Sequence, residues 1–205
     1  MSALSIFLWS FAGYLSGSIP FSFLLGKYLA RKDIRQIGDG NPGGTNAWKA
    51  GGWPVGLLAI ALDIFKGYLP VALAGQAGLD SWALVPVCLA PILGHATTPF
   101  LGFRGGKALG TVGGAWSALI GLWVFWIYTL FSLIALALIK KHAWSAWIGV
   151  TSLIFWSIFV DGSPWMIVLA ILTLLLITWT HRRDLVVPLS LRLWITRRIQ
   201  RWKND

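Results

Sequence analysis

A chain of 205 residues with 57% hydrophobic and only 12% charged residues is not composed like a soluble globular domain. Its 17 basic and 7 acidic side chains give a net charge of +10, and most basic residues fall in short gaps between apolar stretches. This placement is typical of membrane topology and of attraction to anionic lipid or substrate, so no nucleic-acid partner is expected. The single cysteine, Cys88, excludes a disulfide framework and a cysteine-based metal site. No metal is expected.

Apolar runs occupy residues 3–29, 53–77, 82–101, 108–139, 144–160 and 165–179. A helix needs about 20 residues to cross the hydrocarbon of a bilayer, so most of these runs predict one span each. The first run is not preceded by the basic segment of an ordinary signal peptide, because its positive charges follow it. We therefore expect the first run to be a retained span.

The basic residues between the runs predict the orientation. By the positive-inside rule, the gaps after the first run, the third run and run 108–139 are cytoplasmic, whereas the gap with Asp80 is external. An even number of crossings then lies within 108–139. We expect a hairpin of two short helices turning near 118–121, with one strongly tilted helix as the alternative. The predicted fold is an all-α polytopic membrane protein with seven transmembrane helices, an external N-terminus and a cytoplasmic C-terminus.

Residues 1–188 are expected to form a single membrane domain. After it, in residues 189–205, apolar and basic side chains recur at helical spacing. This pattern predicts a basic amphipathic helix lying on the inner leaflet of the membrane.

The segment 38–46 is rich in glycine and amide side chains. It formally matches a dinucleotide-binding loop, but it contains a proline and lies between membrane helices, which excludes that identity. Glycines allow positive φ angles and close approach to a ligand, and successive N–H groups form a concavity suited to phosphate. We predict a phosphate-binding segment here, with a flexible loop as the alternative. Its candidate residues are Asp39, Gly40, Asn41, Gly43, Thr45 and Asn46.

The segment 94–107 ends in a second glycine-rich motif, Gly105-Gly106-Lys107. It is not a Walker A motif, because it lacks the first glycine and the final hydroxyl residue. Lys107 and Arg104 beside two glycines still offer charge and an approachable backbone to a phosphate ester, unless both charges serve topology alone. His95, on an apolar helix, is a candidate ligand or a hydrogen-bonded packing residue.

Two further groups of polar residues stand out. His181 and Asp184 flank two arginines directly after the last run, on the same predicted cytoplasmic face. Asp63 and Lys66 lie three residues apart within the second run, on one helical face. We expect this pair to neutralise each other and to pin helices together, because a lone charge at that depth costs several kcal/mol.

The order and spacing of these segments resemble the bacterial acyl-phosphate:glycerol-3-phosphate acyltransferase family, the PlsY type. The resemblance extends from residues 14–20 through 38–46, 62–67 and 94–107 to His181-Arg182. It implies a cofactor-independent, seven-span enzyme of the bacterial inner membrane with a cytoplasmic active site. Such an enzyme transfers a fatty acyl group from acyl phosphate to glycerol 3-phosphate and makes lysophosphatidic acid. A peripheral enzyme that forms acyl phosphate would be a partner of such a protein.

The resemblance also implies roles for individual residues. The acyl-phosphate end would be held by Gly40, Asn41, Gly43, Thr45, Asn46, Gly105, Gly106 and His181. Lys107 would bridge to the phosphate of the acceptor, and Lys107, His181 and Asn41 are the candidate catalytic residues. Further substrate contacts are expected from Asp39, Lys49, His95, Arg104 and Asp184.

Several acceptor-side positions depart from the family pattern, which usually has Ser at Asp39, Arg at Lys49, Asn at Asp184 and Gly at Ala108. Each carboxylate near a dianionic acceptor would cost on the order of 1 kcal/mol, even with compensation by Lys49 and Arg182. The same chemistry on another acceptor is therefore one alternative, with Asp39 as base or counter-ion. A non-catalytic paralogue that binds acyl phosphate or lipid is another, and a transporter is a weaker one.

Overall fold

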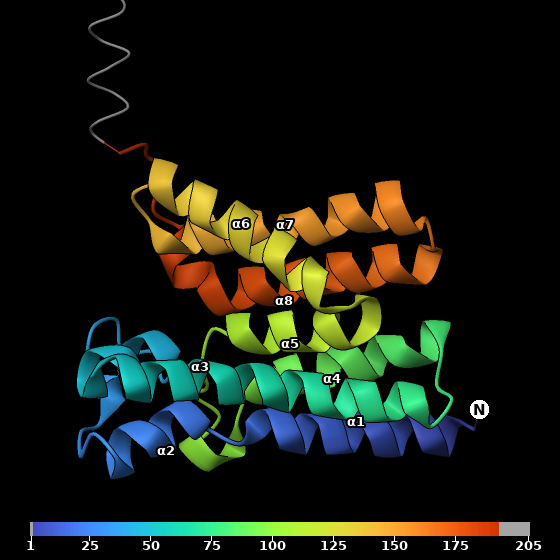
Figure 1. Cartoon of the computed structure of the whole chain (residues 1–205), viewed down its shortest axis with the longest axis horizontal. Coiled ribbons are helices and arrows are strands. Elements are labelled where there is room, and N and C mark those ends of the chain that lie inside the picture. The colour runs from blue at the N-terminus through green and yellow to red at the C-terminus, as the bar shows by residue number, and fades with distance from the viewer. Residues whose placement is uncertain (1, 193–205) are drawn as a thin grey trace, which may run out of the picture. The chain divides into compact units, whose positions relative to one another are not determined.

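The computed structural model describes residues 2–192, except for the side chains of Val124 and Phe125. These residues form α-helices joined by short turns (Figure 1). The chain divides into two compact units, Met1–Phe125 and Trp126–Asp205. Most of the predicted amphipathic tail, residues 193–205, lies outside the described residues.

The first apolar run forms two consecutive helices, α1 (Ala3–Ser18) and α2 (Phe21–Tyr28), which together make up one candidate span with a break inside it. Pro20 causes the break, because proline has no N–H group and disfavours a helical residue before it. Ile19 is accordingly extended, with φ −62° and ψ 117°. At the break, the carbonyl oxygen of Ile19 accepts hydrogen bonds from the Phe21 amide at 3.0 Å and from Lys66 Nζ at 2.8 Å.

The next α-helix, α3 (Gly44–Gln76), starts earlier than the predicted run at 53–77. A non-helical residue, Gly52, with φ 77° and ψ −173°, interrupts it. Hydropathy finds only the part after this interruption, since the first two turns are polar and glycine-rich. Thr45 and Asn46 therefore lie in a helical turn and not in a loop.

The remaining helices of the first unit are α4 (Leu84–Ala96) and α5 (Leu109–Ile120), with the short 3-10 turns η1 (Ile34–Gln36), η2 (Ser81–Ala83) and η3 (Pro99–Leu101). α1 packs on α4, and α3 packs on α5. Glycines bring these backbones together: a Cβ atom on Gly17 would overlap the carbonyl of Pro91, and one on Gly114 would overlap that of Ile64. Small residues serve the same purpose in other membrane helix pairs.

The second unit contains most of α6 (Leu122–Leu138), together with α7 (His142–Trp156), the π-helical turn η4 (Ser157–Asp161) and α8 (Pro164–Leu185). α7 and α8 are joined by a hydrogen bond from Trp147 Nε1 to Thr178 Oγ1 at 2.9 Å. They correspond to the predicted runs at 144–160 and 165–179.

The run at 108–139 forms two short helices, as predicted. Gly121, with φ 90° and ψ 164°, ends α5 and lies within the predicted turn at 118–121. Among the described residues, five helical stretches are long and apolar enough to cross a membrane: Ala3–Tyr28, Gly44–Gln76, Ser81–Leu101, His142–Asp161 and Pro164–Leu185. Leu109–Ile120 and Trp126–Leu138 are shorter apolar helices, so their two crossings remain a prediction.

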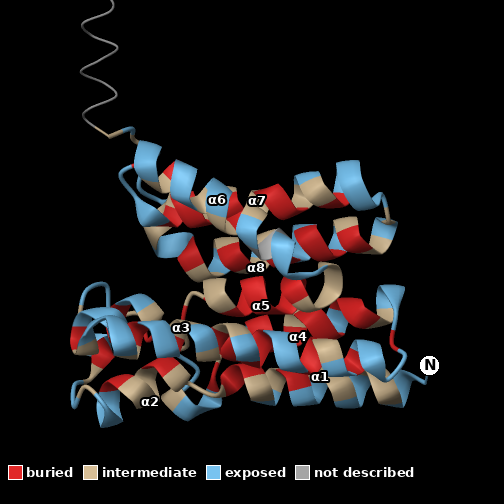
Figure 2. Cartoon of the chain, viewed as in Figure 1, coloured by how far each residue is buried: buried red, intermediate tan, exposed pale blue. Residues whose placement is uncertain are grey.

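Large apolar side chains cover the outside of the first unit. Exposed residues recur along α1 and α3 among buried and partly buried ones (Figure 2), and they include Phe7 at 62% and Phe65 at 51% of their maximal accessible area. Contiguous apolar surface of this kind needs another apolar phase to cover it. The helices therefore suit a lipid environment.

We expect Gly114→Ala to lower the free energy of unfolding by about 1–3 kcal/mol, because the added Cβ forces α3 and α5 apart. The matched control is Gly75→Ala, since a Cβ on Gly75 of α3 meets nothing within 4 Å. Thermal unfolding of both variants in the same detergent checks this expectation. Equal midpoints for the two variants would show that the α3–α5 contact is not close-packed.

Candidate active site

A buried ion pair lies at the centre of the first unit. Lys66 Nζ is 2.8 Å from Asp63 Oδ1, and the two side chains are only 2% and 6% exposed. Ser22 of α2 donates a hydrogen bond to Asp63 Oδ2 at 2.6 Å, while Lys66 also donates to the Ile19 carbonyl. The predicted charge pair is confirmed, and it links α3 to both sides of the Pro20 break.

The ion pair extends towards His95 of α4. Asp63 Oδ1 has no well-aligned hydrogen bond among the described residues, although Lys66 Nζ is close, and the Nδ1 atom of His95 lies 3.8 Å away. The ionic attraction still holds, because it depends mainly on distance. His95 Nδ1 is also 3.2 Å from Thr111 Oγ1 of α5. The polar cluster therefore touches α2, α3, α4 and α5.

The Gly105-Gly106 motif folds back on the end of α4. The amide of Gly105 donates to the carbonyl of Ala96 at 3.1 Å, and that of Gly106 donates to the carbonyl of His95 at 3.0 Å. A Cβ on Gly106 would overlap the His95 ring. The missing side chains thus let the Gly105-Gly106 backbone pack directly against His95. Ala108, one of the departures from the family pattern, has φ 63°, a strained angle for a residue with a Cβ.

The segment 38–46 is held by its own polar side chains. Gly38 and Gly40 have positive φ angles of 62° and 75°, as expected, whereas Gly43 is extended. Asp39 Oδ1 accepts hydrogen bonds from the Asn41 amide at 3.2 Å and from Asn46 Nδ2 at 2.9 Å. These bonds favour an ordered segment over the alternative of a flexible loop.

The two glycine-rich segments meet at an ion pair between Asp39 and Lys107. Asp39 Oδ2 is 2.7 Å from Lys107 Nζ. Partial burial would raise the pKa of Asp39, but hydrogen bonds from Lys107, Asn41 and Asn46 lower it to about 2. Asp39 is therefore ionised at neutral pH. From the sequence we expected Lys49 and Arg182 to compensate this carboxylate, and the pairing with Lys107 was not foreseen.

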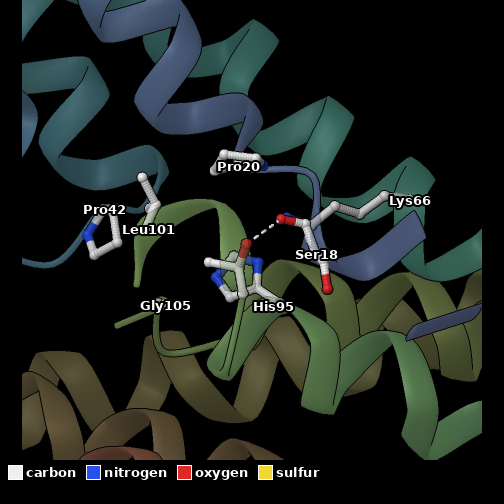
Figure 3. A pocket seen from close by; sticks show the side chains of 9 residues that line it. Ser18, Pro20, Pro42, Lys66, His95, Leu101 and Gly105 are labelled. Atoms are coloured by element: carbon white, nitrogen blue, oxygen red, sulfur yellow. Dashed lines mark hydrogen bonds between the residues drawn. The ribbon is translucent and has the colours of Figure 1, made fainter. Parts of the chain in front are cut away.

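A small pocket lies beside this junction. Its empty volume is about 190 Å³, including its open mouth. It is lined by Ser18, Pro20, Pro42, Lys66, His95, Thr98, Leu101, Gly105 and Gly106. Figure 3 shows His95 between Pro42 and Leu101 on one side and Ser18 and Lys66 on the other. Thr98, which donates a hydrogen bond to the Ser18 carbonyl, was not predicted as a site residue because no motif in the sequence marks it.

The other candidate residues lie on the exposed surface of the first unit or in the second unit. Thr45, Lys49 and Arg104 are exposed, and Lys49 Nζ lies close to where Gly38 would carry a Cβ. His181 and Asp184 belong to α8 in the second unit, where His181 Nδ1 donates to the carbonyl of Ile177 at 3.0 Å. Their participation in the site remains a prediction.

Comparison with known proteins gives consistent matches. The family model for glycerol-3-phosphate acyltransferase matches residues 7–189. Glycerol-3-phosphate acyltransferase 1 of Thermotoga maritima is 38% identical over 188 residues, which cover 84% of this chain and 92% of that protein. The enzyme of Aquifex aeolicus is 37% identical over 186 residues, with 88% and 93% covered.

Solved structures agree with these relatives. PlsY, an integral membrane glycerol 3-phosphate acyltransferase in its glycerol 3-phosphate form, superposes with a TM-score of 0.79 at 34% identity, covering 88% of this chain and 90% of that one. The lysophosphatidic acid form of PlsY gives a TM-score of 0.74 at 31% identity, with 88% and 89% covered.

We expect Asp63→Asn to lower the free energy of unfolding by about 3–5 kcal/mol, because it leaves the Lys66 ammonium buried without a counter-charge. The double variant Asp63→Asn, Lys66→Met should recover part of this loss. The control is Asp33→Asn, which breaks an exposed pair with Arg35 and should cost less than about 1 kcal/mol. Denaturant unfolding in detergent checks these values, and similar losses for Asp63→Asn and Asp33→Asn would contradict a structural role for the buried pair.

Proposed function

Since the chain belongs to the glycerol-3-phosphate acyltransferase family, we propose that it transfers a fatty acyl group from acyl phosphate to glycerol 3-phosphate. The acceptor and the product, lysophosphatidic acid, are those of the family and of the PlsY structures. The main support for this site is the ion pair between Asp39 and Lys107, which joins the two glycine-rich segments.

Acyl phosphate is an activated donor, so the protein need not supply a nucleophile. The acceptor hydroxyl oxygen bonds to the acyl carbon, the bond from that carbon to the phosphate oxygen breaks, and the hydroxyl proton leaves with the phosphate. The contribution of the protein is to position two phosphate groups and to stabilise the developing oxyanion. Glycine turns and a lysine at the membrane surface suit this task.

We assign Lys107 to the phosphate of the acceptor and the two glycine-rich segments to the donor. The proposed donor contacts are Gly40, Asn41, Gly43, Thr45, Asn46, Gly105, Gly106 and His181, and the proposed acceptor-side contacts are Asp39, Lys49, Arg104 and Asp184. His95 supports the Gly106 turn through its carbonyl oxygen and borders the pocket with its ring. The acyl chain would lie among the helices.

The proposed topology has seven spans, an external N-terminus and a cytoplasmic C-terminus. It is supported by the break at Gly121 and by the basic gaps after α2, η3 and α6. Residues 1–188 would form one membrane domain and 189–205 a surface helix. The active site would face the cytoplasm of a bacterial cell, where a peripheral enzyme could deliver acyl phosphate.

Purified protein given acyl phosphate tests the proposed donor and acceptor together. With glycerol 3-phosphate we expect lysophosphatidic acid and inorganic phosphate in equal amounts, and with no acceptor we expect neither. Acyl coenzyme A should not replace the donor. Product formed from another alcohol but not from glycerol 3-phosphate would support a changed acceptor, and a protein that binds acyl phosphate without turnover would support the non-catalytic alternative.

We expect Lys107→Ala to abolish acyl transfer while the protein still inserts and folds, because its partner Asp39 is half-exposed and can be solvated. Arg104→Ala should have a milder effect, since Arg104 is exposed and neighbouring charges can partly replace it. Initial rates of lysophosphatidic acid formation measure both. If Lys107→Ala kept more than about a tenth of the wild-type rate, Lys107 would not be the phosphate ligand.

The topology is tested with reporter tags in intact cells. Tags at the N-terminus and in the turn at Asp161 are expected to be external, and tags at Lys141 and at the C-terminus internal. Protease protection or thiol labelling gives the result for each tag. An internal N-terminus would contradict the seven-span topology.

A further inference from the structure

We propose that Asp39 determines acceptor affinity by competing with the phosphate of the substrate for Lys107, an inference that rests on the proposed function. Asp39 Oδ2 already lies 2.7 Å from Lys107 Nζ. A phosphate that binds Lys107 Nζ therefore comes close to the carboxylate of Asp39, which already contacts the same nitrogen.

The carboxylate of Asp39 is held in place independently of Lys107. Its other oxygen, Oδ1, accepts from the amide of Asn41 and from the side chain of Asn46, which is 2% exposed. Asn46 also donates to the Asn41 carbonyl at 2.9 Å. Asp39 is thus part of a rigid turn, so a phosphate cannot simply push it aside without breaking these bonds.

Competition follows from the charges. The ammonium group of Lys107 has three donors and could reach both a carboxylate and a phosphate oxygen. The two anions would then lie within a few ångströms of each other and repel. Asp39 remains charged during any assay near neutral pH, because its pKa is about 2. A phosphate that approaches Lys107 therefore meets an ionised carboxylate.

This repulsion acts on phosphate groups and not on the acyl chain. It should raise the KM for glycerol 3-phosphate and also weaken inhibition by inorganic phosphate that competes with glycerol 3-phosphate for Lys107. Because both effects concern binding of an anion at Lys107, kcat should change little. A residue that positions Lys107 would behave in the opposite way, since its loss would raise KM.

The test variant is Asp39→Asn, which removes the charge but keeps an oxygen that can accept from Asn41 and Asn46. We expect the KM for glycerol 3-phosphate and the inhibition constant of inorganic phosphate each to fall by at least about threefold, with kcat unchanged within about twofold. Asp39→Ser, which can also accept from the turn, should act in the same direction if Asp39→Asn fails to fold.

The matched control is Asp33→Asn. Asp33 pairs with Arg35 at 2.6 Å, and this arginine lowers the pKa of Asp33 to about 2, so the variant makes the same change in net charge away from Lys107. The KM for Asp33→Asn should stay at the wild-type value. An unchanged or raised KM in both Asp39 variants, or an equal fall in Asp33→Asn, would overturn the proposal.

Calorimetric titration of the purified proteins with glycerol 3-phosphate, in the absence of acyl phosphate, separates this inference from the proposed function. Tighter binding to Asp39→Asn than to the wild type and Asp33→Asn supports competition at Lys107 even in a preparation that makes no lysophosphatidic acid. Equal affinity for all three proteins contradicts it. Absence of turnover in the wild type, by contrast, contradicts only the proposed function.

Discussion

A charge buried among apolar helices must have a partner, and the Asp63–Lys66 pair meets this constraint in the first unit. The ammonium donates a hydrogen bond to the carbonyl of Ile19, which lies at the helix break before Pro20. The carboxylate uses the hydroxyl of Ser22 just beyond the break. The polar groups at the helix break therefore provide hydrogen bonds to both members of the buried ion pair.

The position of the glycine turn depends on the same cluster. His95 lies beside Asp63 and Thr111, and its carbonyl holds the amide of Gly106. Lys107 follows directly and reaches Asp39 in the other glycine-rich segment. A chain of contacts thus leads from the buried pair to the candidate phosphate ligand. An activated donor requires little beyond such positioning, because proximity and electrostatic stabilisation can supply much of the rate.

Features set by local spacing could be predicted from the sequence. Asp63 and Lys66 pair because residues three apart share a helical face, and Gly121 ends a helix inside a run too long for one upright span. The positive φ angles of Gly38 and Gly40 follow from the missing side chain.

Features that depend on tertiary contact could not be predicted in this way. Asp39 and Lys107 are 68 residues apart, and nothing local distinguishes this pairing from one with Lys49. The early start of α3 was missed because its first turns are polar, and hydropathy reports only apolar segments. The Pro20 break was hidden for the opposite reason, since apolar residues continue on both sides of it.

The most direct test of the site is a structure of this protein with glycerol 3-phosphate bound. We expect the phosphate to lie within hydrogen-bonding distance of Lys107 Nζ and next to the Gly105-Gly106 turn, with the contact between Asp39 and Lys107 longer than its present 2.7 Å. Glycerol 3-phosphate bound elsewhere, with the Asp39–Lys107 pair intact, would contradict the assignment of Lys107 to the phosphate of the acceptor.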